Sequence, residues 1–144
     1  MTDPVEIKGQ CLCGAVQVRA KTSAPRLRAC HCDMCRQHTS GAFVSLETIA
    51  GSQQIDGVTA QYQSSSWAHR GFCPICGSTL WSEPEGSHGK VLSAGLFPNA
   101  GGGTLKVEFF ADQCPQGYGF AGDQTKLNTD ETLALFAPKE GTDT

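Results

Sequence analysis

We predict an all-β fold, in which nearly all regular structure is strand, from three features of the sequence. In several short segments apolar residues alternate with polar ones, which is the period of a half-buried strand. Glycine is abundant, with 17 of 144 residues, and many glycines fall in turn-like clusters between these segments. Long segments with the 3.6-residue period of a helix are lacking. The length is that of one ordinary domain, so residues 1–144 are expected to form a single unit.

The expected strands follow one another along the chain. In the first of them Val16 and Val18 share one face, and in the last Phe109 lies on the apolar face while Glu108 lies on the polar one. The expected strands are residues 14–20, 41–49, 57–64, 78–82, 90–97 and 104–111. The turns between or after them are residues 55–57, 83–89, 98–103 and 112–119.

Two short helices complete the expected secondary structure. One covers residues 129–136, where Thr129 or Asp130 is expected to cap the sequence ETLALF. The other follows Cys35. The tail, residues 138–144, is expected to be loose.

The charge and hydropathy of the chain argue against nucleic acids and membranes as partners. The net charge is −3 and the basic residues are scattered, whereas phosphate binding needs clustered Lys and Arg. No apolar run approaches the roughly 18 residues that span a bilayer. The sequence MTDPVEIKG at the start resembles no export signal, so we expect a cytoplasmic protein. Cysteine clusters in that reducing compartment more often bind metal than form disulfides.

The spacing of the eight cysteines divides them into groups. Zinc takes tetrahedral thiolate ligands from tight turns, and the turn in CPICG suits it because Pro74 fixes φ and Gly77 can adopt a positive φ. The C-x-C of CLCG, again followed by a glycine, can add two more ligands. A closed, structural zinc site is therefore predicted from Cys11, Cys13, Cys73 and Cys76.

Cys30, Cys32 and Cys35 remain as a C-x-C-x-x-C group. Three protein ligands with a vacant fourth position distinguish a catalytic zinc from a structural one, so we expect this group to hold a second, open zinc site. Some alternatives stay open at this point. A C-x-x-C pair could be a thioredoxin-like redox pair, the thiols could form disulfides or a redox sensor that releases zinc, and iron could replace zinc in a tetrahedral sulfur site.

Four segments in this order, CLCGAV, CHCDMCRQHTSGAF, YQSSSWAHRGFCPICGSTLW and LSAGLF, resemble the glutathione-dependent formaldehyde-activating enzyme family, which includes centromere protein V-like domains. The resemblance runs from about Gly9 to Phe120. It implies a β-tent fold of twisted antiparallel sheets with two zinc ions, held by the same two cysteine groups. The implied activity is a carbon–sulfur lyase reaction, which joins glutathione as co-substrate to formaldehyde.

Some residues near the second site are further candidates. Arg36 and Arg70 could bind the carboxylates of glutathione. The side chain of His31 is expected to point away from the metal, because neighbours in an extended C-x-C face opposite ways. Cys114 is expected to be a free thiol, and it would close the second site if it were a ligand. His38 could face the site. His69 and His88 are expected at the surface, Trp67 and Trp81 as packing residues beside CPICG, and Phe109 and Phe110 in the core.

Three functions remain in competition. The first is an enzyme that joins a small-molecule thiol to an aldehyde. The second keeps the zinc–thiol chemistry but acts on a different thiol substrate. The third is a non-enzymatic, zinc-stabilised β module that binds another protein, which a closed second site would favour.

Overall fold

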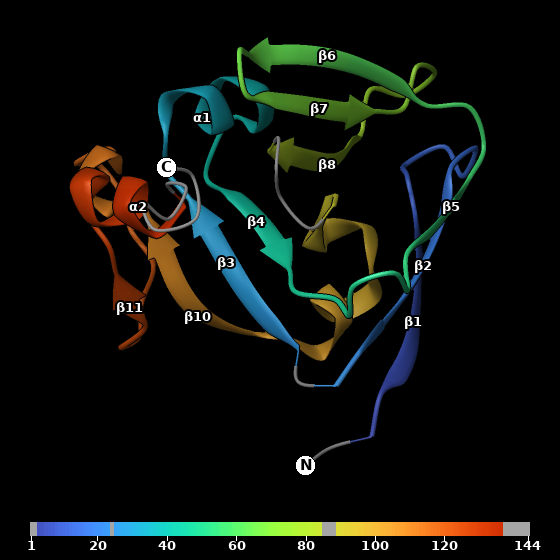
Figure 1. Cartoon of the computed structure of the whole chain (residues 1–144), viewed down its shortest axis with the longest axis horizontal. Coiled ribbons are helices and arrows are strands. Elements are labelled where there is room, and N and C mark those ends of the chain that lie inside the picture. Colours follow the sequence, from blue (N-terminus) through green and yellow to red (C-terminus); the bar gives the residue numbers. More distant parts are fainter. Residues whose placement is uncertain (1–2, 24, 85–88, 137–144) are drawn as a thin grey trace, which may run out of the picture.

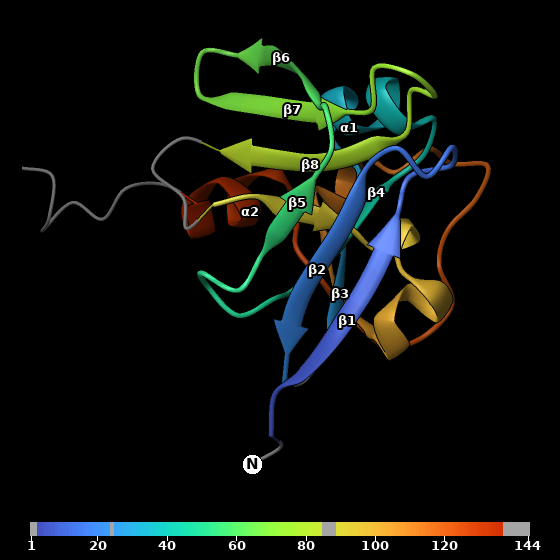
Figure 2. The same cartoon turned by 90° about the vertical axis from the view of Figure 1, so that its right-hand side faces the viewer.

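The computed structural model describes residues 3–23, 25–84 and 89–136. The expected loose tail, His88 and residues 85–88 of one expected turn lie outside the described residues. Two β-sheets form the body of the protein (Figures 1 and 2). Within the described ranges, no helix has the length and apolar character needed to cross a membrane.

The first sheet has three strands and the second has eight. The order in the first sheet is β1 (Val5–Gln10), β2 (Gln17–Thr22) and β5 (Gln54–Asp56). The order in the second is β11 (Thr125–Lys126), β10 (Thr104–Phe109), β3 (Arg26–Cys30), β4 (Phe43–Leu46), β9 (Val91–Ser93), β8 (Thr79–Pro84), β7 (Ala68–Phe72) and β6 (Ala60–Ser65).

The predicted all-β class is confirmed, and most neighbouring strands are antiparallel. Two ladders are parallel: β10 pairs in this way with both β3 and β11. The pairing of β10 with β3 places Phe109 opposite Cys30. Strand β10 is thereby brought against the C-x-C-x-x-C segment, which lies about 80 residues earlier in the sequence.

Two α-helices are present among the described residues. The helix expected at residues 129–136 is confirmed as α2 (Thr129–Phe136), but Asn128 caps it in place of Thr129 or Asp130. Its side-chain oxygen accepts a hydrogen bond from the Glu131 N–H, and the Asn128 N–H donates one to the Glu131 carboxylate. The other helix, α1 (Asp33–Thr39), begins before Cys35, not after it.

The strand predictions were right in position more often than in length. The strand expected at residues 14–20 begins only at Gln17, because Cys13 and Gly14 form a turn. The one expected at residues 90–97 ends at Ser93 and continues as a 3₁₀ turn. Sequence alternation missed β1, β3, β5, β7 and β11, and the turn expected at residues 55–57 was wrong in part, because β5 covers residues 54–56.

The main hydrophobic core combines residues of both sheets. Val18 of β2, and Val16 just before that strand, pack in one cluster with Leu80, Trp81 and Leu92 from the second sheet. All five are almost inaccessible to solvent, and burial of each large side chain contributes about 1.5–3 kcal/mol. The two sheets are therefore held together by a core that lies apart from the C-x-C-x-x-C segment.

Candidate metal centres and the adjoining pocket

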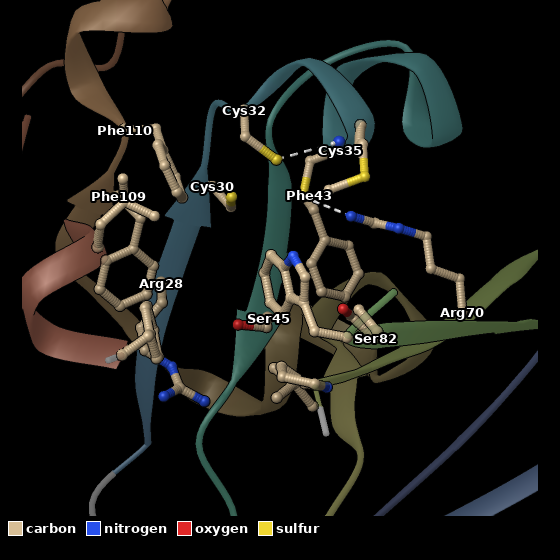
Figure 3. A pocket seen from close by; sticks show the side chains of 17 residues that line it. Arg28, Cys30, Cys32, Cys35, Phe43, Ser45, Arg70, Ser82, Phe109 and Phe110 are labelled. Carbon is tan, nitrogen blue, oxygen red and sulfur yellow. Dashed lines mark hydrogen bonds between the residues drawn. The ribbon is translucent and has the colours of Figure 1, made fainter. Parts of the chain in front are cut away.

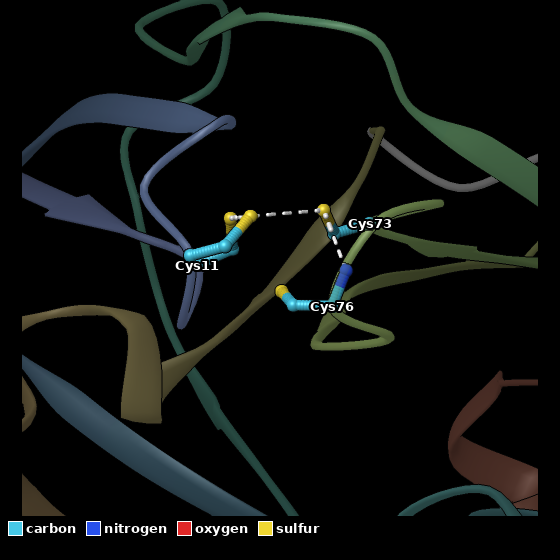
Figure 4. Close-up of side chains that lie close together, drawn as sticks. Cys11, Cys73 and Cys76 are labelled. Carbon is cyan, nitrogen blue, oxygen red and sulfur yellow. Dashed lines mark hydrogen bonds between the residues drawn. The ribbon is translucent and has the colours of Figure 1, made fainter.

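The first cysteine group joins two turns that are far apart in sequence. Cys11 and Cys13 lie in the turn after β1, whereas Cys73 and Cys76 lie in the turn after β7 (Figure 4). The four sulfur atoms lie within 4.8 Å of one another. The sulfur of Cys13 is 3.7 Å from that of Cys11 and 3.8 Å from that of Cys73. The two sheets therefore meet at these thiols.

These separations match a tetrahedral metal site. Four sulfur ligands at the zinc–sulfur distance of about 2.3 Å lie about 3.8 Å from one another. Both turns have the geometry expected from the sequence, since Gly14 has φ +82° and Gly77 has φ +79°. Positive φ is strained for residues with a side chain. The group therefore fits zinc, and its donor set would equally suit iron.

Hydrogen bonds favour the thiolate form of two members of this group, Cys11 and Cys76. The backbone N–H of Val16 donates to the sulfur of Cys11, at 3.3 Å. The Ser78 hydroxyl lies 3.1 Å from the sulfur of Cys76, and its hydrogen bond is the largest cause that lowers the pKa of Cys76 to about 5. Ionised sulfur is the form that binds metal.

The second group lies at the junction of β3 and α1 (Figure 3). The sulfur atoms of Cys30, Cys32 and Cys35 lie within 4.8 Å of one another. Cys32 caps α1, and its sulfur accepts a hydrogen bond from the Cys35 N–H at 3.4 Å. Hydrogen bonds from Cys30 and Cys35 lower the pKa of Cys32, and the positive charge of Arg70 contributes. Within the described ranges, no fourth cysteine, histidine or carboxylate joins this group.

Arg70 is buried beside this group. Its side chain donates from Nη2 to the sulfur of Cys35, at 3.4 Å, and the residue is only 5% exposed. Its Nε and Nη1 have no hydrogen-bond partner among the described residues. A buried cation is costly unless it is paired, and the Cys32 thiolate, whose pKa Arg70 helps to lower, supplies negative charge beside it.

Arg36 is already engaged within its own helix. It forms an ion pair with Asp33 and donates from Nε to the carbonyl of His31 at 3.3 Å. Roles of Arg36 and Arg70 in binding a substrate carboxylate stay predictions. Of the two, Arg70 keeps unused donors beside the thiols.

His31 and Cys114 both lie outside the second group of thiols. The His31 ring is fully buried, with Nε2 2.7 Å from a carboxylate oxygen of Glu108, and Gln124 donates to the other oxygen at 2.6 Å. Glu108 is buried, although alternation gives it to the polar face of its strand, because His31 and Gln124 bind its carboxylate there. The thiol of Cys114 contacts the Tyr118 carbonyl instead.

A cavity of about 140 Å³ opens beside the three thiols. Most of its lining is apolar and much of it is aromatic (Figure 3). Phe109 and Phe110, expected in the core, both line it. Trp81 packs in the core as expected, but Trp67 is 48% exposed and lines the cavity. These aromatic residues thus line a candidate site, whereas the sequence favoured packing roles for them.

A larger cavity of about 610 Å³ adjoins the first. The two share the residues Arg28, Trp67, Pro84, Val91 and Phe136 in their linings. Arg28 forms no side-chain hydrogen bond or ion pair with the described parts of the chain, and its buried Nε has no partner. Desolvation lowers the pKa of Arg28.

Sequence reasoning missed Arg28, although a signal was present. It precedes Cys30 by two residues on β3, and residues two apart on a strand face the same side. Figure 3 shows its guanidinium on the lower side of the pocket, away from the thiols. An unpaired cation therefore stands where the two cavities meet.

Comparison with known proteins identifies a family for this chain. Residues 6–113 match the family model described as glutathione-dependent formaldehyde-activating enzyme. The chain belongs to this family. It is also 32% identical over 130 residues to an uncharacterized lyase of Schizosaccharomyces pombe, covering 89% of this chain and 95% of that protein.

One solved structure shows the same fold. It is a crystal structure of a Rhodobacter sphaeroides protein, 19% identical, with a TM-score of 0.51 and coverage of 62% of this chain and 86% of that one. The family and the lyase relative support a glutathione-related lyase. The two cysteine groups could each hold a metal ion.

Proposed function

We propose that this protein is a zinc-dependent carbon–sulfur lyase-type enzyme. It joins glutathione, or a related thiol, to formaldehyde or another aldehyde to give an S-hydroxymethyl-type adduct, and it catalyses the reverse reaction. The observation that carries this proposal is the three-thiol group at one end of a pocket, with no fourth ligand among the described residues. A closed site would leave no position for a substrate.

The two cysteine groups take different roles in this proposal. The four thiols that join the sheets hold a structural zinc, and Cys30, Cys32 and Cys35 hold the second. These three thiolates would leave one position of a bound zinc open, and a substrate thiol bound there would lose its proton readily. The proposal assigns the chemistry to the three-thiol group, because that group alone lines the pocket.

The chain's own residues prepare this position. Arg70 stabilises the Cys35 thiolate through its Nη2 hydrogen bond, and the α1 backbone stabilises the Cys32 thiolate. Arg28 and the unused donors of Arg70 supply positive charge for the two carboxylates of glutathione, and Arg36 follows Cys35 directly in α1.

The reaction needs no redox partner. The thiolate sulfur attacks the aldehyde carbon, a carbon–sulfur bond forms as the carbonyl π bond opens, and the oxygen gains the proton that the thiol has lost. The protein contributes ionisation of the thiol and proximity of the two reactants. The apolar pocket excludes water from the reacting atoms.

An exchange measurement tests the proposal. The rate of S-hydroxymethylglutathione formation from glutathione and formaldehyde is measured by two-dimensional NMR exchange, with zinc-loaded protein and without it. We expect acceleration by the wild type, loss of it in Cys32→Ser, and wild-type rates in Cys114→Ser, a matched change outside both thiol groups. No acceleration with any thiol and aldehyde would overturn the proposal and favour a zinc-stabilised binding module.

A further inference from the structure

We propose that the 140 Å³ cavity binds an apolar group of the carbonyl substrate, and that this substrate is an aldehyde with an aryl or branched alkyl group about the size of a benzene ring. This inference rests on the proposed function, since it concerns the same three-thiol site. It names a class of aldehyde larger than formaldehyde. The thiol then occupies the adjoining larger cavity.

The lining of the cavity is the first argument. Apart from the thiols, two arginines and two serines, the side chains around it are apolar. These apolar residues are Met34, Phe43, Trp67, Ala68, Pro84, Val91, Phe109, Phe110, Leu133 and Phe136. Such a lining favours a ligand that has few polar atoms.

The size of the cavity is the second argument. Its volume is about 140 Å³, and an apolar protein cavity of about 150 Å³ is known to stay dry and to bind benzene. Formaldehyde carries only two hydrogen atoms on its carbonyl carbon and would leave most of this volume unfilled. The apolar walls would then remain without contacts, and binding would gain nothing from them.

The distribution of charge identifies which reactant carries the apolar group. Glutathione has two carboxylates, and transfer of a carboxylate into an apolar cavity is costly unless it is paired. The adjoining cavity of about 610 Å³ has room for a peptide thiol and has polar as well as apolar walls. Arg28 lies on the border of both cavities and forms no ion pair among the described residues, although the nearby charge of Glu47 favours its cationic form. The thiol therefore fits the larger cavity, and the aldehyde side group fits the smaller one.

The reaction is the same addition with a larger aldehyde. The thiolate sulfur bonds to the aldehyde carbon, the carbonyl π bond opens onto oxygen, and that oxygen gains the proton lost by the thiol. The product is a hemithioacetal that carries the apolar group on its new stereocentre. No oxidant or reductant takes part.

Comparison of two aldehydes tests the inference. The rate enhancement over the uncatalysed reaction is measured by NMR exchange with zinc-loaded protein, glutathione, and either benzaldehyde or formaldehyde. We expect the enhancement to be at least about tenfold larger for benzaldehyde, because burial of a ring-sized group stabilises its complex by that factor or more. A larger enhancement for formaldehyde would overturn the inference while the proposed function stood.

Variants that fill the cavity test whether the preference for benzaldehyde depends on this cavity. Two such variants are Ala68→Leu, at a buried position of the cavity wall, and Leu133→Trp, at an exposed position of α2. Each should lower the ratio of the benzaldehyde enhancement to the formaldehyde enhancement about tenfold or more. Ala60→Leu, on β6 and outside both linings, is the matched control and should keep the wild-type ratio. A ratio that is unchanged in both filled variants, folded by their thermal unfolding, would overturn the inference.

A binding measurement separates the pocket from the chemistry. Benzyl alcohol, an unreactive analogue, is titrated into the full-length protein by calorimetry. We expect binding that Ala68→Leu weakens at least about tenfold. If the protein accelerates the reaction of neither aldehyde, the proposed function fails. The titration still tests the cavity in that case, and absence of benzyl alcohol binding would overturn the inference.

Discussion

Loss of one thiol should have very different effects in the two cysteine groups. In Cys76→Ser the four-thiol group loses a ligand that connects the turn after β7 to the turn after β1. In Cys32→Ser the three-thiol group loses a ligand, but its members all lie within one short segment. The free energy of zinc binding at a structural site adds to the free energy of folding. The contribution of each site to stability therefore depends on how far apart in the sequence its zinc-bound cysteines lie.

The magnitude follows from the length of chain that each group closes. Cys13 and Cys73 are 60 residues apart, and a cross-link around a loop of that length stabilises the folded state by about 4 kcal/mol in the chain-entropy model. Cys30 and Cys35 close a loop of only about five residues, for which the same model gives about 2 kcal/mol. In a chain of this size each kcal/mol shifts the Tm by about 2–4 °C.

Calorimetry and metal analysis of the two variants check this difference. We expect Cys76→Ser to lower the Tm by about 8–16 °C or to prevent folding. We expect Cys32→Ser to fold, with about half that shift or less, and to contain one zinc instead of two. Equal loss of stability in both variants would refute the division into a structural and an open site.

Further predictions concern the packing and the metals. Gly71→Ala should lower the free energy of unfolding by about 1–3 kcal/mol in urea titrations, because a Cβ there would lie 2.2 Å from the ring of Trp81; an unchanged midpoint would contradict that contact. Glu108→Ala should cost about 1–3 kcal/mol, because it leaves the buried ring of His31 without its partner; the urea midpoint should fall while zinc content stays at two. A chelator should remove one zinc per chain while the far-UV circular dichroism is unchanged, and the second only as the protein unfolds; simultaneous loss of both would contradict two distinct sites.

The cysteine groups could be predicted from sequence because their geometry is local. A turn in CPICG or CLCG fixes two sulfur atoms through the bonds of a few residues, and Gly14 and Gly77 mark the positive φ that each turn requires. Three residues of a C-x-C-x-x-C segment are likewise brought together by one strand end and one helical turn. Spacing alone therefore indicated which thiols are neighbours in space.

The pocket could not be predicted in this way, because its walls come from distant segments. The parallel pairing of β10 with β3 brings Phe109 opposite Cys30, and α2 then adds Phe136, whose ring packs edge-on against that of Phe109. The buried pair of His31 and Glu108 spans 77 residues. Strand alternation gives the face of a residue but not the partner that covers it, so the burial of Glu108 could not be predicted.

The most direct test of an open three-thiol site is the absorption spectrum of cobalt-substituted protein during titration with glutathione. Cobalt reports the number of thiolates bound to it, so a new sulfur ligand is visible as an increase in the thiolate-to-cobalt charge-transfer band. We predict two metals per chain and a band that grows with glutathione in the wild type, and no growth in Cys32→Ser. Two metals with a spectrum that no thiol changes would contradict an open site, and with it the enzyme proposed here.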